Sequence, residues 1–262
     1  MKQWSKTEAE GFAEKTNPLY PKTVIDLIKP APHDRVLDVG CGPGTLSIPL
    51  ARRVESVTAL DTSEGMLGVL KSCADAEGLE NIMCVKRFWR EAEPGVDIGE
   101  EYDLVVVSNC INLLGALEVP SEDGRVRVEW DLVDALRRLN RVARRVCVTM
   151  PVTDFLNEDV AAFRSLGREY HAAPSNIHVY NVIYQLGLRP GVSYFLRGNF
   201  GDKVVAKYLD SLNWMLSPRP EECERIRRGT ESVKAEIENS VHVWTMITWD
   251  KEQVRCLTAD TS

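Results

Sequence analysis

Short apolar runs alternate with amphipathic segments through most of the first half of the chain. Apolar runs of this length predict buried strands, and apolar residues three or four positions apart predict helices. The predicted strands are residues 35–39, 56–60, 81–89, 102–109 and 145–152, and the predicted helices between them are 44–54, 63–78 and 128–145. Buried strands that alternate with helices favour an α/β fold with a parallel sheet covered by helices.

Further elements are predicted on both sides of this core. Residues 5–30 have the pattern of two helices that break at Asn17 and Pro18. Later helices are predicted at 157–170, 176–187, 202–215 and 219–238, and later strands at 191–197 and 242–250. Because no repeat or linker interrupts the chain, we expect one domain over residues 1–262. It would comprise an N-terminal helical cap (1–30), a core (33–152), a second cap with one strand (153–241) and a last strand (242–250).

The segment VLDVGCGPGTLSIPLA, residues 36–51, joins the first predicted strand to a helix through Gly40, Gly42 and Gly44. Glycine permits a positive φ and lets a ligand approach the backbone, and a helix N-terminus presents free N–H groups. The spacing is G-x-G-x-G, with Thr45 where a dinucleotide fingerprint has its third glycine, and the lysine of a P-loop is missing. Both phosphate-binding interpretations are therefore weakened.

Two acidic residues near this loop indicate a different ligand. Asp38 precedes Gly40 by two positions, where a carboxylate would repel a pyrophosphate and attract an ammonium group. Asp61 ends the second predicted strand and can accept hydrogen bonds from both hydroxyls of a ribose. A ligand with an amine at one end and a ribose further along is S-adenosylmethionine.

With these features the chain resembles the class I S-adenosylmethionine-dependent methyltransferases. DVGCGPGT is similar to the first motif of that family and ALDTSEGML to the second, and the resemblance covers roughly residues 33–152. The general pattern is similar to uncharacterised prokaryotic small-molecule methyltransferases. The resemblance implies a Rossmann-like, mainly parallel sheet of seven strands in the order 3-2-1-4-5-7-6. The antiparallel strand 7 would be residues 242–250.

The resemblance also implies which residues bind S-adenosylmethionine and its product S-adenosylhomocysteine. Asp38 and the glycine loop would hold the methionine end, Asp61 the ribose, and Ser108 and Asn109 would lie near the sulfonium. The full set of expected cofactor-binding residues is Asp38, Gly40, Cys41, Gly42, Gly44, Thr45, Asp61, Thr62, Met66, Trp89, Ser108, Asn109 and Tyr20. Thr62 and Met66 would lie beside the adenine. Trp89 stands after the third strand, where the family commonly has an acidic residue, and is either an adenine neighbour or a core aromatic.

The acceptor and the catalytic residues are less well defined by the sequence. The sulfonium methyl is already activated, so the main requirement is in-line placement of a nucleophile, and a general base is needed only for a protonated acceptor. The N-P-P-Y and D-P-P-Y motifs of base-amine methyltransferases are missing from SNCI after the fourth strand. We therefore expect a small-molecule acceptor. The alternatives are an RNA or protein methyltransferase, a non-catalytic cofactor-binding module and a nicotinamide dehydrogenase.

Composition and charge restrict the partners. The 262 residues are 44% hydrophobic and 27% charged, as in soluble globular proteins. No apolar run has the length of a membrane span and the N-terminus lacks a signal-peptide core, so we expect a cytoplasmic protein without a membrane partner. The net charge of −7 disfavours nucleic acid, for which the basic run 137–145 is the main support. Seven scattered cysteines without a CxxC pair predict no metal site. The sequence is also compatible with a homodimer.

Overall fold

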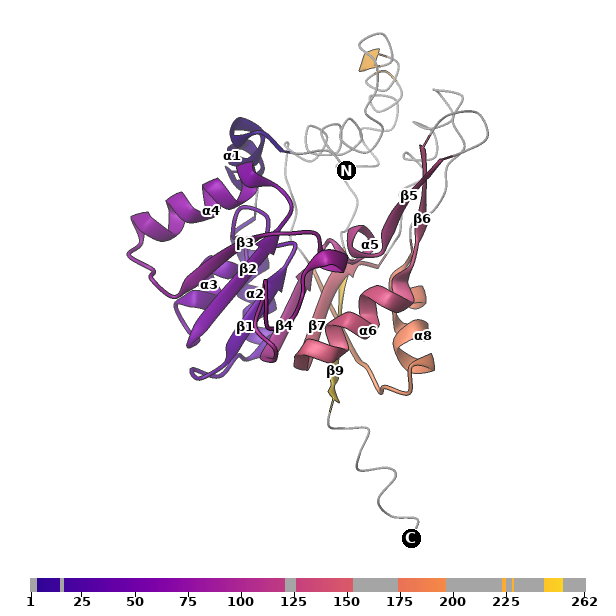
Figure 1. The fold of residues 1–262 in the computed structure, drawn as a ribbon. Coiled ribbons are helices and arrows are strands. Elements are labelled where there is room, and N and C mark those ends of the chain that lie inside the picture. Colours follow the sequence, from indigo (N-terminus) through magenta and orange to yellow (C-terminus); the bar gives the residue numbers. More distant parts are fainter. Residues whose placement is uncertain are drawn as a thin grey trace.

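Seven strands form one sheet in the computed structural model of the chain (Figure 1). Their order is β3-β2-β1-β4-β7-β9-β8. The strands are β1 (Arg35–Val39), β2 (Ser56–Asp61), β3 (Ile82–Lys86), β4 (Tyr102–Ser108), β7 (Ala143–Pro151), β8 (Gly191–Leu196) and β9 (Val243–Asp250). The structure describes residues 4–14, 17–120, 126–152, 174–196, 223–224, 228 and 243–251.

The strand directions confirm the expected Rossmann-like sheet. The five strands from β3 to β7 in the sheet are parallel, and β9 runs antiparallel to both β7 and β8. Two more strands, β5 (Ala116–Pro120) and β6 (Val126–Trp130), pair with each other outside this sheet. Numbered within the sheet alone, the order is 3-2-1-4-5-7-6. The labels differ from this order because they also count β5 and β6, which lie outside the sheet and were not among the predicted strands.

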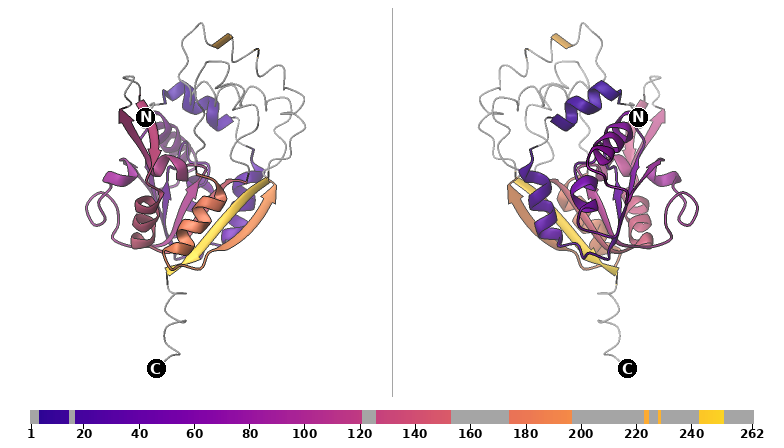
Figure 2. Two further views of the ribbon diagram at one scale, coloured as in Figure 1. Left: turned by 90° about the vertical axis from the view of Figure 1, so that its right-hand side faces the viewer. Right: turned by 90° about the vertical axis from the view of Figure 1, so that its left-hand side faces the viewer.

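Helices cover both faces of the sheet (Figures 1 and 2). They are α1 (Lys6–Glu14), α2 (Leu19–Ile28), α3 (Ser47–Ala51), α4 (Glu64–Ala76), α5 (Ile111–Leu114), α6 (Leu132–Val142) and α8 (Asn176–Gln185), with a 3-10 turn η1 at Trp89–Glu91. Val36 and Val106 pack with α2 and α3, whereas Leu37 and Val105 pack with α6 and α8. β4 is therefore buried on both faces, as its unbroken apolar run predicts.

The N-terminal helices lie on the same side of the sheet as α3 and α4. α1 packs against α4 through Ala9, Met66 and Val69, and α2 buries Val24 and Ile25 in the cluster that includes α3. The predicted break between the two helices is confirmed, because α1 ends at Glu14 and α2 begins at Leu19. Ser63 is the N-cap of α4, since its side chain accepts a hydrogen bond from the Met66 N–H.

Three predicted elements differ from the structure by more than two residues at one end or both. The helix predicted at 44–54 is limited to Ser47–Ala51, because Gly44 has a φ of 93°, which a right-handed helix cannot contain. The strand predicted at 81–89 ends at Lys86, which pairs with Asp61, the last residue of β2. The helix predicted at 128–145 begins only at Leu132, after the N-cap Asp131.

Several predicted segments fall outside the described residues. The helices predicted at 157–170 and 202–215 lie there entirely, and of 219–238 only residues 223–224 and 228 are described, all three helical. The predicted domain boundaries therefore stay a prediction. Among the described helices, none has the length and apolar character that a membrane span requires.

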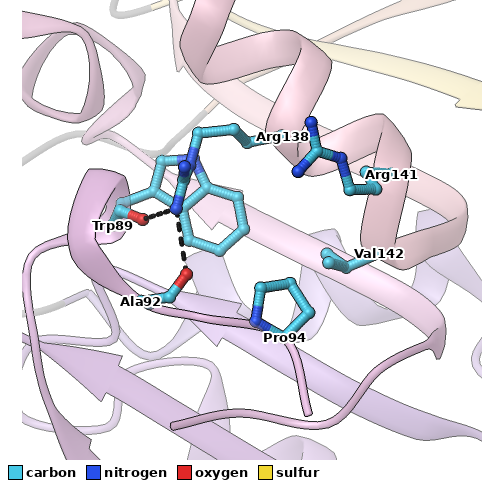
Figure 3. A pocket seen from close by; sticks show the side chains of 6 residues that line it. All are labelled: Trp89, Ala92, Pro94, Arg138, Arg141 and Val142. Carbon is cyan, nitrogen blue, oxygen red and sulfur yellow. Dashed lines mark hydrogen bonds between the residues drawn. The ribbon is translucent and has the colours of Figure 1, made fainter. Parts of the chain in front are cut away.

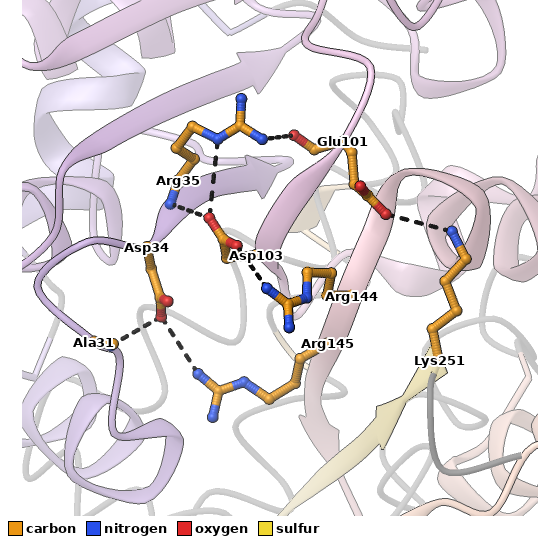
Figure 4. A network of polar contacts seen from close by, with 8 residues as sticks. All are labelled: Ala31, Asp34, Arg35, Glu101, Asp103, Arg144, Arg145 and Lys251. Atoms are coloured by element: carbon orange, nitrogen blue, oxygen red, sulfur yellow. Dashed lines mark hydrogen bonds and ion pairs between the residues drawn. The ribbon is translucent and has the colours of Figure 1, made fainter. Parts of the chain in front are cut away.

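Charged residues join the strand starts at the amino end of the sheet (Figure 4). The Asp103 carboxylate lies 3.9 Å from the Arg35 Nε and 3.5 Å from an Arg144 nitrogen. Asp34 lies 3.6 Å from Arg145, whose guanidinium also donates to the carbonyl of Ile28 at 2.9 Å. Most of these side chains are partly exposed, so each pair stabilises the fold by no more than about 1 kcal/mol. The network occupies the end of the sheet opposite to the glycine loop.

The stability of this fold is expected to depend on the buried face of α6. Leu139 is fully buried, whereas Val133 on the same helix is 38% exposed. Leu139→Ala should lower the free energy of unfolding by about 2–5 kcal/mol, because it removes packed methyl groups and leaves a cavity. Urea unfolding followed by circular dichroism measures this change. Val133→Ala serves as the control and should change stability by about 0.5 kcal/mol or less. Equal losses in both variants would contradict the packing described for α6.

Candidate functional site

The glycine loop between β1 and α3 contains three residues with positive φ. The φ values are 72° at Gly40, 54° at Gly42 and 93° at Gly44. A Cβ at position 40 would lie 2.4 Å from the Cys110 Sγ, so only glycine fits there. A Cβ at position 42 would meet no described atom within 4 Å. Gly42 therefore leaves one side of the loop open, where a ligand can approach the backbone.

Hydrogen bonds attach this loop to the end of β2. The N–H groups of Gly40 and Cys41 both donate to the carbonyl of Leu60, at 2.8 and 3.1 Å. The Gly42 N–H donates to Asp61 Oδ2 at 2.9 Å. The structure thus brings together two motifs that are about twenty positions apart in the chain.

Asp38 is almost completely buried, with an exposed fraction of 1%. Its Oδ2 accepts a hydrogen bond from the Ser47 hydroxyl at 2.6 Å, and its Oδ1 has no partner among the described residues. Burial raises the pKa of Asp38 to about 7, and the nearby Asp61 carboxylate contributes in the same direction. A buried carboxylate oxygen without a partner is costly, so this position favours a cationic group.

Asp61 presents its carboxylate at the same edge of the sheet. Besides the Gly42 contact, its Oδ1 accepts a hydrogen bond from the Ser63 N–H at 2.9 Å. Burial raises its pKa above the usual value, while these backbone hydrogen bonds act in the opposite direction. Each carboxylate oxygen can accept about two hydrogen bonds, so acceptor capacity remains on both oxygens for a diol.

The chain after β4 forms the third side of the site. Asn109 has a φ of 54°, and its N–H donates to the Thr149 carbonyl at 2.8 Å. The Cys110 thiol donates to the Val39 carbonyl at 3.1 Å, next to Gly40. Ser108 and Asn109 therefore follow the carboxyl end of β4, beside the end of β1. In parallel α/β sheets this edge is where ligands bind.

Tyr20 and Trp89, two aromatic residues predicted to contact the cofactor, are buried in the structure. Tyr20 is 2% exposed, and its hydroxyl lies 2.6 Å from the Ser108 Oγ. Trp89 is 4% exposed, and its indole N–H donates to the Ala135 carbonyl at 3.3 Å. The Arg138 guanidinium lies 5.8 Å from the centre of the Trp89 ring and donates to the carbonyls of Trp89 and Ala92 (Figure 3). Trp89 thus packs as a core aromatic against α6.

The cavity beside Trp89 is too small for a cofactor. Its volume is about 10 Å³, which is room for about one water molecule. It is lined by Trp89, Ala92, Pro94, Arg138, Arg141 and Val142 (Figure 3). Met66, predicted beside the adenine ring together with Thr62, is buried under α1 beside Ala9. The contacts of Trp89, Met66 and Thr62 with adenine stay a prediction.

Some residues of the site were not found by the sequence analysis. Ser47 binds Asp38, Cys110 lies against Gly40, and Thr149 holds the backbone of Asn109. Ser47 could have been found, because it stands three positions after Gly44, at the start of α3. Cys110 and Thr149 have no sequence signal, since their contacts arise from the pairing of β4 with β1 and β7.

Comparisons with known proteins agree with this geometry. Residues 36–121 match the family described as "Methyltransferase domain". The chain contains a class I S-adenosylmethionine-dependent methyltransferase domain. This confirms the predicted family and cofactor, S-adenosylmethionine. The assignment of individual residues to that cofactor stays a prediction.

Two relatives and one solved structure show how far the similarity extends. An uncharacterized protein of Haemophilus influenzae is 24% identical over 243 residues, which cover 90% of this chain and 83% of that protein. A ubiquinone biosynthesis O-methyltransferase of Rhizobium leguminosarum is 40% identical over 84 residues, 32% of each chain. Phospholethanolamine N-methyltransferase 2 of Haemonchus contortus, in complex with phosphomonomethylethanolamine and S-adenosylhomocysteine, has a TM-score of 0.60 at 16% identity. That match covers 95% of this chain and 58% of the other and shows a shared fold.

The residues at the edge of the sheet fit the cofactor of this methyltransferase domain. The unpartnered Oδ1 of Asp38 suits the ammonium group of its methionine end. The open side of Gly42 leaves space for a ligand against the loop backbone, and the Asp61 carboxylate suits a ribose diol.

Gly42→Ala is expected to weaken binding of S-adenosylhomocysteine by about tenfold or more, because the new Cβ occupies the open side of the loop. Isothermal titration calorimetry measures this affinity. Gly78→Ala is the matched control, since Gly78 has a φ of 65° and no described atom near its Cβ position. Both changes introduce a left-handed alanine, at a cost of about 1–2 kcal/mol in stability. Equal affinities of the two variants would contradict a ligand at the open side of Gly42.

Binding of S-adenosylhomocysteine is expected to depend on pH through Asp38. The ligand's ammonium group requires a carboxylate, and the pKa of Asp38 in the free protein is about 7. A proton must therefore leave before binding at lower pH. The affinity should rise with pH up to about 7 and then become constant, with a slope approaching tenfold per pH unit below that value. Calorimetric titrations at several pH values measure this slope. Asp38→Asn should bind more weakly and without the slope. A slope retained in that variant would assign the titration to another group.

Proposed function

We propose that this methyltransferase transfers the methyl group of S-adenosylmethionine to a small-molecule acceptor. The observation that carries the proposal is the arrangement of Asp38, the glycine loop and Asp61 at one edge of the sheet. The cofactor supplies a methyl group on a positively charged sulfur, which an acceptor nucleophile can take up directly. The carbon–sulfur bond breaks with its electron pair left on sulfur, and S-adenosylhomocysteine is the product.

The contribution of the chain to this reaction is binding and orientation. Asp38 would pair with the ammonium group, and the Asp61 carboxylate would accept hydrogen bonds from the ribose hydroxyls. With both ends held, the methyl group would lie near the end of β4, where Ser108 and Asn109 follow the strand. Placement of this kind is the largest catalytic factor for an already activated methyl group. No side chain is assigned as a general base.

Two observations support a small molecule as the acceptor. A segment of the chain is similar to a protein named ubiquinone biosynthesis O-methyltransferase, and the fold is shared with a methyltransferase in complex with phosphomonomethylethanolamine. The net charge of −7 does not favour a polyanionic acceptor.

The contacts of the basic run 137–145, which covers the end of α6 and the start of β7, weigh against RNA. Arg138 donates to the carbonyls of Trp89 and Ala92, and Arg144 and Arg145 pair with aspartates at the strand starts. Three of the five arginines in residues 137–145 are therefore engaged within the fold. Their charges are not arranged as a free basic surface.

Asp61→Asn is expected to weaken S-adenosylhomocysteine binding by about 1.5–3 kcal/mol, because the ribose hydroxyls lose a charged acceptor. Isothermal titration calorimetry measures the loss, with NADH as the control ligand for the wild type. Asp75→Asn is the control variant, since Asp75 is an exposed residue of α4 and the same charge is removed. Unchanged affinity in Asp61→Asn would refute the ribose assignment, and NADH binding would refute the cofactor.

The acceptor class is tested by transfer of labelled methyl from S-adenosylmethionine. The protein is incubated separately with a small-molecule extract, with total RNA and with a protein fraction. We expect label in the small-molecule fraction only, and less of it with Asp61→Asn at the same S-adenosylmethionine concentration. Label in RNA or protein would overturn the acceptor class. Cofactor binding without transfer to any fraction would indicate a non-catalytic module.

A further inference from the structure

Three hydroxyl groups from separate elements meet between α2 and the carboxyl ends of β4 and β7. The Tyr20 hydroxyl lies 2.6 Å from the Ser108 Oγ and 2.8 Å from the Thr149 Oγ1. Tyr20 and Thr149 are buried, and Ser108 is half-buried. A phenol hydroxyl both donates and accepts, so Tyr20 can hold both partners at once.

The ring of Tyr20 is held from the other side by aromatic residues of the last two strands. Its centre lies 5.3 Å from that of Trp244 in an edge-on arrangement and 6.2 Å from that of Phe195. The hydroxyl position is therefore fixed by packing as well as by hydrogen bonds. Such a side chain can hold its partners in one geometry.

The partners of Tyr20 flank a backbone turn in an unusual conformation. Ser108 directly precedes Asn109, and the Thr149 carbonyl accepts the Asn109 N–H at 2.8 Å. With its φ of 54°, Asn109 is in the left-handed region, which a non-glycine residue keeps only where its surroundings hold it there. Tyr20 thus contacts the first residue of the turn 108–110 and the β7 residue whose carbonyl accepts the Asn109 N–H.

The turn 108–110 in turn contacts the glycine loop. A Cβ at position 40 would lie only 2.4 Å from the Cys110 Sγ, so this sulfur packs directly against Gly40. The Cys110 thiol also donates a hydrogen bond to the Val39 carbonyl. A shift of the turn would move this sulfur into the loop or away from it. Because interiors are close-packed, the geometry of the turn restricts that of the loop.

We propose that Tyr20 is a positioning residue of the methyltransferase. Its hydroxyl holds the turn 108–110 and, through Cys110, the Gly40 loop in the geometry that binds S-adenosylmethionine. This role acts through Ser108 and Thr149, in place of the direct contact with the cofactor predicted for Tyr20 from the sequence. The inference rests on the proposed function, which requires that loop to bind the cofactor. It also makes the position of the N-terminal helix α2 part of the binding site.

Tyr20→Phe tests the role, because it keeps the ring and removes only the hydroxyl. Tyr102→Phe is the matched control. Tyr102 is 4% exposed, its hydroxyl donates to the Thr58 Oγ1 at 3.0 Å, and it lies at the opposite end of β4. By calorimetric titration with S-adenosylhomocysteine, Tyr20→Phe should bind about tenfold more weakly than wild type, and Tyr102→Phe within about twofold of it. An equal change in both variants would overturn the role, because it would reflect general loss of stability.

Amide hydrogen exchange in the ligand-free protein gives a second readout. The Asn109 amide should exchange faster in Tyr20→Phe and in Thr149→Val, which keeps the Thr149 carbonyl but removes its hydroxyl. Tyr102→Phe should leave this rate unchanged. An Asn109 rate in Tyr20→Phe equal to that of wild type would overturn the proposal. If wild-type protein does not bind S-adenosylhomocysteine, the proposed function fails, and the exchange rates still decide whether Tyr20 holds the turn.

Discussion

The Asp61 carboxylate accepts a hydrogen bond from the Gly42 N–H, and the rest of the site depends on this contact. It joins the end of β2 to the loop that leaves β1, and the Leu60 carbonyl holds two further loop amides beside it. These bonds fix the first half of the loop, and the Gly44 carbonyl accepts the Ile48 N–H of α3 at 3.0 Å. One side of Gly42 then stays open toward a ligand, and the carboxylate that holds the loop is the one proposed to accept the ribose hydroxyls.

Electrostatics at this edge of the sheet favour a cationic ligand over an anionic one. Burial raises the pKa values of both Asp38 and Asp61, and the Asp61 carboxylate further disfavours ionisation of Asp38. An ammonium group near Asp38 would relieve that repulsion, whereas a pyrophosphate would increase it. In the proposed function these two carboxylates favour a sulfonium cofactor with an ammonium group over a dinucleotide, although the strand–loop–helix geometry is common to both classes of protein.

Local signals account for most of the elements and for the errors in their bounds. Ser63 and Asp131 are N-caps whose side chains accept backbone N–H groups, and the helices begin directly after them. Periodicity predicted a helix from residue 128, because the alternation in residues 126–130 is short and only its pairing with β5 makes it a strand. Similarly, β3 ends at Lys86, where its partner β2 ends, and apolar character alone could not show that limit.

The sequence by itself determined the parallel sheet, the glycine loop and its two acids, and hence the class of cofactor. These features are encoded by residues close together in the chain, where glycine conformation, strand burial and capping act locally. Only the tertiary structure decided that Cys110 lies against Gly40, that Trp89 packs under α6, and that the Tyr20 hydroxyl reaches Ser108 and Thr149. These contacts join residues that are 46 to 129 positions apart in the chain. They exist only because strand pairing and helix packing bring those residues together.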